Sequence, residues 1–207
     1  MTAVTFVKPS LRDRKKAATR EAIFAAAVRL FSERGFDRPT IDEIAAAAGT
    51  GKGTFYNYFS SKEDILVAYM IEIEGQVQRR IAKFAEATGP LEQILSDLLR
   101  YYFRLKRPYL AFSRILLAEV IQRAAALQDS IERMQEIIDP ALNTLFTRLK
   151  ERKLIHASVD VATAVHSFKV IHFFLSCLWS MEGPPFRGTL HAINEQANDL
   201  ARRLQRR

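Results

Sequence analysis

The sequence predicts an all-α protein, with an N-terminal three-helix domain of helix-turn-helix type joined to a larger C-terminal helical domain. Three observations support this prediction. Apolar residues recur at helical spacing along nearly all of the 207 residues. Glycine and proline stand mainly at the breaks between these segments. We find no stretch with the two-residue alternation of a strand, and no repeat.

The first four helices are bounded by recognisable start and stop residues. A helix over 13–34 is expected to stop at Gly35, and the sequence Thr40-Ile41-Asp42-Glu43 is a capping box that opens a short helix ending at Gly49. Gly51–Tyr58 forms a third helix, and a second box, Ser60-Ser61-Lys62-Glu63, starts a longer one that ends near Gly89.

Four or five further helices follow in the C-terminal region. The sequence predicts them at residues 91–106, 109–124, 128–152, 158–181 and 188–205. Pro140 is expected to kink or break the third of these. We therefore divide the chain into a flexible arm (1–11), a helix-turn-helix domain (12–60) and a helical domain (61–207).

Charge is concentrated near the start of the chain. The net charge is 31 − 23 = +8, and residues 1–62 carry 11 basic and 6 acidic side chains, a net of 11 − 6 = +5. Such a basic region is typical of a surface that meets phosphates, although a solvated basic face is an equal alternative.

Composition excludes several other classes of protein. With 48% hydrophobic and 26% charged residues, the chain is typical of a soluble globular protein. The single cysteine, Cys177, excludes an intramolecular disulfide and a paired-thiol zinc site, and it favours a reducing compartment. Met1–Ser10 lacks a signal-peptide pattern, and the apolar run Phe168–Met181 is expected to be too short and too polar to span a membrane. We expect a cytoplasmic protein with no membrane partner.

The segment 40–62 carries the main functional signal. A capped helix of small residues stops at Gly49 and turns within a few residues into a second short helix, which is the pattern of a helix-turn-helix. In that second helix Phe55 and Phe59 share a core-facing side, while Gly53 and Asn57 lie roughly opposite. A surface of small polar residues offers hydrogen bonds to bases and phosphates with little bulk.

Enzymatic motifs are absent from the sequence. The glycines of 49–54 superficially match nucleotide-binding loops, but the Walker pattern lacks its first glycine and the dinucleotide pattern lacks its third. No nucleophile elbow and no metalloprotease motif is present. We therefore predict no enzyme, no cofactor and no metal site, although sequence alone does not exclude a pair of catalytic carboxylates.

The block Gly-x-x-Lys-Gly-Thr-x-Tyr-x-Tyr-Phe-x-Ser-Lys-Glu at residues 49–63 resembles the recognition helix and the following helix start of the tetracycline-repressor (TetR) family. The resemblance covers about fifty residues, Ile23 to Leu66. It implies DNA contacts from Thr40, Thr50, Lys52, Gly53, Thr54, Tyr56, Asn57, Tyr58 and Lys62.

Three of these positions have particular expectations. Gly51 stands where the family often has a capping serine, so Thr50 is expected to take over the cap. Asn57 occupies a position that varies with operator sequence in the family, which implies a role in specificity. Lys62 is expected to pair with a phosphate. The basic residues Arg12, Arg14, Lys15 and Lys16 either follow the adjacent backbone or form a solvated helix start.

The last two predicted helices carry more apolar surface than one core-facing side requires. In Phe168–Met181 the polar residues fall within an arc of about 80°, and the following segment has apolar residues at 3,4 spacing. Pairing with the same helices of a second chain would bury both faces, as in the resembled family; a purely intrachain core is the alternative. The predicted dimer interface comprises Phe174, Leu178, Leu190, Ile193, Ala197, Leu200 and Leu204.

A cavity for an effector is expected between the helices of 91–181. Its predicted lining is Tyr101, Tyr102, Phe112, Phe146, Phe168, His172 and Trp179. Because aromatic residues at helical spacing are often simple core, a packed interior is the alternative for most of them. An aromatic and aliphatic lining favours an apolar or flat aromatic effector.

The sequence therefore predicts a homodimeric transcriptional regulator, a repressor rather than an activator, that binds a palindromic double-stranded DNA operator and is released by an unidentified small effector. The alternative is a helical ligand-binding or scaffold module whose helix-turn-helix is vestigial. The effector, the operator and the direction of the ligand's effect are not given by the sequence.

Overall fold

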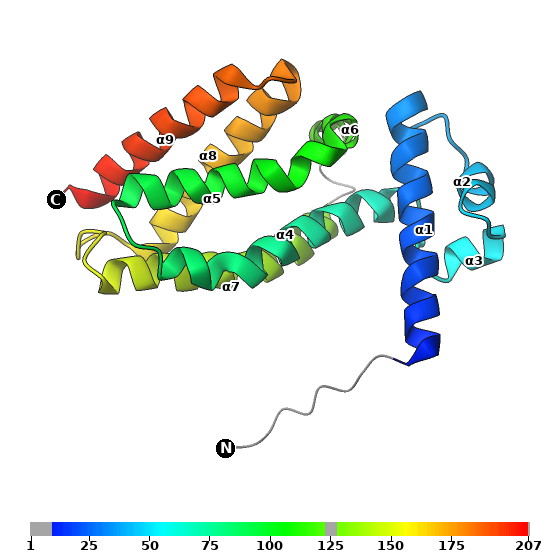
Figure 1. The fold of residues 1–207 in the computed structure, drawn as a ribbon, viewed down its shortest axis with the longest axis horizontal. Helices are drawn as coiled ribbons and strands as arrows, with labels where there is room; N and C mark the ends of the chain where they lie inside the picture. The colour runs from blue at the N-terminus through cyan, green and yellow to red at the C-terminus, as the bar shows by residue number, and fades with distance from the viewer. Residues whose placement is uncertain (1–9, 123–127, 207) are drawn as a thin grey trace. The chain divides into compact units, whose positions relative to one another are not determined.

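The computed structural model describes residues 10–122 and 128–206, and over these residues the chain forms nine α-helices, one 3-10 helix and no strand (Figure 1). The predicted all-α class is confirmed. The chain divides between Ile65 and Leu66 into two compact units, which we describe separately. Residues 1–9 of the expected arm, and residues 123 and 124 of the expected 109–124 helix, lie outside the described residues.

The first unit contains α1 (Leu11–Arg34), α2 (Ile41–Ala47) and α3 (Lys52–Tyr56). The capping box at Thr40 is confirmed: the Thr40 hydroxyl accepts from the Glu43 amide at 3.2 Å, and the Glu43 carboxylate accepts from the Thr40 amide at 2.8 Å. The buried side of α1, with Ile23 and Phe31, packs against α2, and α2 packs against α3. The short α3 is thus held in place by α2, which itself packs on α1.

The next helix is α4 (Glu63–Ala85), and the serine hydroxyl that caps it lies one residue later than predicted. We expected Ser60 and Glu63 to form the box. In the structure the Ser61 hydroxyl accepts from the Asp64 amide at 3.3 Å, and the Asp64 carboxylate accepts from the Ser60 amide at 2.7 Å. The prediction was wrong by one residue because two serines followed by two acidic residues offer two equivalent registers.

The remaining helices form the second unit, together with most of α4. They are α5 (Leu91–Lys106), the 3-10 helix η1 (Arg107–Tyr109), α6 (Leu110–Gln122), α7 (Gln128–Glu151), α8 (Val161–Glu182) and α9 (Arg187–Gln205). Helix α7 continues through Pro140, so this proline does not end it. Glu182, at the end of α8, accepts from the amides of Gly188 and Thr189 at 2.7 Å and so caps the start of α9.

The apolar seam of α9 faces its own chain. Ile193, Ala197, Leu200 and Leu204 are buried, and α9 packs against α5 and α8. We had assigned these four residues to a dimer interface. Their 3,4 spacing does mark a helix–helix seam, but the partner helices belong to the same protomer. Leu190, one turn earlier, is 41% exposed.

Helix α8 has apolar surface that its own chain leaves uncovered. Val170, Phe173, Phe174 and Met181 are all exposed, and Leu178 is half-buried. By length and composition this 22-residue helix is apolar enough to cross a membrane, with 28% of the apolar window buried in the chain. The apolar run Phe168–Met181, which we expected to be too short and too polar to span a membrane, is the C-terminal part of a helix that starts seven residues earlier, at Val161.

The packing of α9 predicts which leucines support the protomer. Replacing Leu200, which is 2% exposed, by alanine removes contacts with α5 and α8 and should lower the free energy of unfolding by about 2–5 kcal/mol. Ile121→Ala is the matched control, since Ile121 is 63% exposed and should cost less than about 1 kcal/mol. Urea unfolding followed by circular dichroism measures both, and equal losses would contradict the assignment of Leu200 to the core.

Candidate functional site

Helix α3 and the residues directly after it present small polar groups to solvent on one side and two phenylalanines to the core on the other. Phe55 and Phe59 are buried, with ring centroids 5.9 Å apart. Gly53, Tyr56 and Asn57 are exposed, and Tyr56 retains 50% of its accessible surface. The exposed side of α3 therefore has hydrogen-bonding side chains and a stretch of bare backbone at Gly53.

The structure places the residues with predicted DNA contacts at the start of α2, in the turn between α2 and α3, on α3, and in the segment between α3 and α4. Exposed among them are Thr40, Lys52, Gly53, Tyr56 and Asn57. Half-buried are Thr50, Thr54, Tyr58 and Lys62. All nine lie in the first unit, so the set is brought together as one region rather than scattered over the molecule.

The cap of α3 differs from the expectation. Gly51 is the N-cap residue and makes no side-chain hydrogen bond to the helix. The Thr50 hydroxyl donates instead to the Ala45 carbonyl at 3.3 Å, back toward α2. Thr50 therefore ties the turn to α2 and does not replace the missing cap.

Lys52 begins α3 and pairs with Asp42 of α2. Its Nζ lies 2.9 Å from the Asp42 carboxylate, and this interaction raises the pKa of Lys52. Both side chains are more than half exposed, so the pair contributes little to stability and can exchange Asp42 for another anion.

Lys62 binds the loop between α1 and α2, and we call these contacts the Lys62 clasp. Its Nζ donates to the carbonyls of Phe36 and Asp37 at 3.0 and 3.1 Å and lies 5.0 Å from the centroid of the Phe36 ring. We expected Lys62 to pair with phosphate; in the structure two of its three N–H groups satisfy backbone carbonyls. One N–H remains for an outside acceptor.

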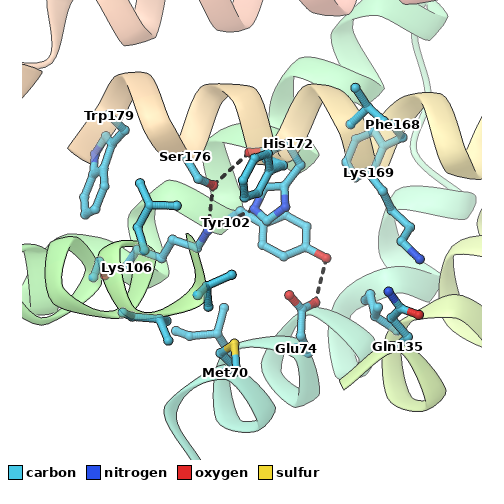
Figure 2. A pocket seen from close by; sticks show the side chains of 18 of the residues that line it. Met70, Glu74, Tyr102, Lys106, Gln135, Phe168, Lys169, His172, Ser176 and Trp179 are labelled. Atoms are coloured by element: carbon cyan, nitrogen blue, oxygen red, sulfur yellow. Dashed lines mark hydrogen bonds between the residues drawn. The ribbon is translucent and has the colours of Figure 1, made fainter. Parts of the chain in front are cut away.

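The second unit contains a cavity of about 520 Å³ between α4, α5, α6, α7 and α8 (Figure 2). Its lining is mainly aliphatic and aromatic, as in sites for small organic ligands. The residues are Tyr69, Met70, Ile73, Glu74, Tyr102, Lys106, Ser113, Leu116, Leu117, Val120, Gln135, Ile138, Leu142, His166, Phe168, Lys169, Val170, His172, Phe173, Ser176, Trp179 and Ser180.

Four of the seven predicted ligand residues line this cavity: Tyr102, Phe168, His172 and Trp179. The other three do not. Phe112 and Phe146 are fully buried and pack behind the wall, against the rings of Tyr69 and Phe168 respectively. Tyr101 turns away and packs on Phe84.

Lys106 lies at one side of the cavity, as Figure 2 shows. Its Nζ is 3.0 Å from His172 Nε2 and donates to Ser176 Oγ at 2.9 Å. Ser176 in turn donates to the His172 carbonyl at 2.8 Å. Burial lowers the pKa of Lys106 to about 8, and burial together with the nearby Lys106 charge keeps the pKa of His172 well below its usual value. His172 is therefore the neutral acceptor of the pair.

Glu74 faces the same cavity from α4. It accepts a 2.9 Å hydrogen bond from the Tyr102 hydroxyl, and burial raises the pKa of its carboxyl. Burial and the Glu74 carboxylate together raise the pKa of Tyr102 well above 10. The cavity thus contains a buried acid, Glu74, and a half-buried base, Lys106, on separate helices and among apolar side chains.

Sequence reasoning missed Lys106 and Glu74. Glu74 sits among other charged residues of α4, and Lys106 is the last residue of α5, where a basic residue is usual. The tertiary fold brings them together, and no local pattern signals that. Among the described residues no group of three His, Cys, Asp or Glu side chains could hold a metal ion. Burial raises the pKa of Cys177, which gives no sign of a reactive thiolate.

The N-terminal part of the chain is similar in sequence to known regulatory proteins. The model of the family described as "Bacterial regulatory proteins, tetR family" matches residues 23–69, which span the second half of α1, all of α2 and α3, and the start of α4. The HTH-type transcriptional regulator RutR of Escherichia coli strain K12 is 31% identical over 120 residues, covering 58% of this chain and 56% of RutR. The chain therefore matches little more than half the length of this relative.

Solved structures extend the likeness to the whole fold. The fatty acid degradation regulator FadR from Bacillus halodurans has a TM-score of 0.76 at 23% identity, over 97% of this chain and 100% of that one. FadR from Bacillus subtilis, solved in complex with stearoyl-CoA, has a TM-score of 0.72 at 23% identity, over 87% and 97% of the two chains. At this identity the likeness concerns the fold.

The Lys62 clasp predicts a local effect on the α1–α2 loop. Lys62→Met removes both hydrogen bonds to the loop carbonyls, so amides of residues 34–40 should exchange with deuterium about tenfold faster. Lys52→Met is the control, because Lys52 pairs with an exposed carboxylate and contacts no loop carbonyl. Unchanged exchange in Lys62→Met, measured by mass spectrometry without DNA, would leave Lys62 as a phosphate contact only.

Proposed function

Because this chain belongs to the tetracycline-repressor (TetR) family, we propose that it is a transcriptional repressor that binds an operator as a dimer and leaves it when a small effector occupies its cavity. The proposal assigns DNA binding to the first unit and ligand binding and dimerisation to the second. Because the partner that we propose is DNA, we also propose a cytoplasmic location.

The observation that carries the DNA-binding proposal is the exposed side of α3. Tyr56, Asn57 and the Gly53 backbone face solvent, while Phe55 and Phe59 fix the helix from behind. A fixed helix with small polar groups fits the major groove, where base edges are read by hydrogen bonds. We assign Asn57 and Tyr56 to base contacts, and Thr40, Lys52 and the third N–H of Lys62 to phosphates.

The exposed apolar stripe of α8 supports the dimer. Val170, Phe174 and Met181 recur at helical spacing and are each more than half exposed, and Phe173 adjoins them. Such a patch on a soluble regulator calls for a covering surface, and a two-fold axis lets the same stripe of a second copy provide it. The revised interface comprises this stripe with Leu178 and Leu190, without the buried seam of α9.

The cavity supports an effector. Its volume of about 520 Å³ falls in the range of roughly 300–1,000 Å³ that small-molecule sites occupy. Helix α4 contributes Met70, Ile73 and Glu74 to the lining, and its first residue follows Lys62 directly. We propose that occupancy changes α4 and thereby the operator affinity. A vestigial helix-turn-helix is not favoured, because α3 keeps its exposed polar residues.

Selection of DNA from a random pool tests the proposal. The purified full-length chain should enrich a palindrome with half-sites about one helical turn apart. Its affinity should fall roughly 10³–10⁵-fold between about 50 and 200 mM salt if about 6–10 phosphates are contacted. No enrichment from protein freed of bound small molecules would overturn the proposal.

A substitution at Gly53 can test DNA contact without destabilising the fold. A Cβ built at Gly53 meets no heavy atom within 4 Å among the described residues, so Gly53→Ala should leave thermal stability unchanged or slightly higher. If the α3 backbone approaches DNA at Gly53, the added methyl should weaken operator binding at least about tenfold. Gly75→Ala, in α4, is the control and should bind normally; equal binding by both variants would remove Gly53 from the interface.

Phe174 tests the dimer. Phe174→Glu places a charge in the stripe and should give a monomer by light scattering, with loss of palindrome binding. Ile121→Glu is the matched control, since Ile121 is also an apolar residue that is more than half exposed, and it lies on another helix, α6. A Phe174→Glu protein that stays dimeric would exclude the α8 stripe as the interface.

A further inference from the structure

The cavity contains a lysine whose hydrogen-bond partners are all neutral. Lys106 Nζ contacts His172 Nε2 and Ser176 Oγ, and it lies 5.5 Å and 5.9 Å from the ring centroids of Phe103 and Tyr102. Over the described part of the chain no carboxylate lies within ion-pair distance of this nitrogen. Two of its three N–H groups are thus occupied, and the third has no partner among the described residues.

The other lysine of the lining differs in this respect. Lys169 Nζ lies 2.8 and 3.0 Å from the two carboxylate oxygens of Asp139, so its charge is already neutralised. Figure 2 shows Lys106 and Lys169 on opposite sides of the pocket. The cavity therefore has one cation in direct contact with a carboxylate, and a second, Lys106, that Glu74 attracts through space without touching it.

A charge placed in an apolar cavity is costly unless it is paired. Burial accordingly depresses the pKa of Lys106 to about 8, which still leaves it mostly protonated near neutral pH. An anion bound beside Nζ would remove this cost and accept the free N–H. The apolar remainder of the lining has no such requirement and favours a hydrocarbon or ring.

We propose that the cavity is a site for a small amphiphile with a single carboxylate head group, bound so that the carboxylate pairs with Lys106 and the apolar body lies along α6 and α7. The apolar surface it would contact comes from Leu116, Leu117 and Val120 of α6 and from Ile138 and Leu142 of α7. The inference rests on the proposed function only in taking this cavity as the effector site.

Glu74 limits the charge of the ligand. It lies in the same cavity, and burial raises the pKa of its carboxyl. In its ionised form Glu74 would repel each additional negative charge of a ligand. A monoanion can be balanced by Lys106 alone. Head groups with two negative charges are therefore disfavoured at this end of the cavity, and the charge of Lys106 disfavours a cationic head group beside it.

The chain provides its own reporter for this test. Trp179 is the single tryptophan of the sequence and lines the cavity, so its fluorescence reports occupancy without a label. Full-length protein, stripped of bound lipids on a hydrophobic resin, is titrated near neutral pH with decanoate, decan-1-ol and decylamine, which share one chain and differ in head group. Decanoate should bind at least about tenfold more tightly than decan-1-ol, and decylamine more weakly than either.

Lys106→Met keeps the length of the side chain and removes its charge. In this variant the preference for decanoate over decan-1-ol should disappear, while decan-1-ol binds as before. Lys169→Met is the matched control and should retain the preference, because the Lys169 charge is already paired. Lys106→Arg should retain at least part of it.

The wild-type titration decides the matter even where a variant fails to fold. Equal affinity for decanoate and decan-1-ol, tighter binding of decylamine, or no binding of any of the three would each overturn the proposal. So would a folded Lys106→Met protein that keeps its preference. None of these measurements uses DNA, so failure of the carboxylate site and failure of operator binding are seen in separate experiments.

Discussion

The second unit depends on one constraint: α8 has apolar residues on nearly all of its sides, and these have to be covered. An amphipathic helix buries one side of roughly 100° and exposes the rest to water. Helix α8 is apolar nearly all round: Phe168, Leu175 and Trp179 enter the core, while Phe173 and Phe174 stay outside. One chain cannot cover all of this surface. In the fold, α9 packs on one side of α8, a second side lines the cavity, and a third side stays exposed, where we propose that a second copy binds.

The first unit also depends on packing between its elements, because α3 is too short to be stable by itself. Helix α3 has five residues, far fewer than an isolated helix needs to form in water, so its position is imposed from outside. Phe55 and Phe59 supply that restraint through the core, and the Lys62 clasp restrains the α1–α2 loop next to them. The exposed side of α3 is consequently free to carry residues chosen for contact rather than for helix stability.

Local signals in the sequence were enough for the helices and the helix-turn-helix, but not for their partners. The Thr40–Glu43 box and the predicted 91–106 helix are confirmed, because capping and period are properties of neighbouring residues. The seam of α9 was real but assigned to the wrong helix, since spacing tells which side is buried and not what covers it. Lys106 was missed because only tertiary packing brings α5 against Ser176 of α8.

The cavity and the apolar stripe share a wall, and this links the two proposed properties of the second unit. Val170 and Phe173 line the cavity and are also more than half exposed on the face we assign to the dimer. A ligand that moves either side chain changes the surface offered to the partner, and a partner that fixes them changes the cavity. Thermodynamic linkage makes the two effects equal. An effector can therefore shift the dimer geometry, and with it DNA affinity, by no more than its own difference in affinity for the two geometries.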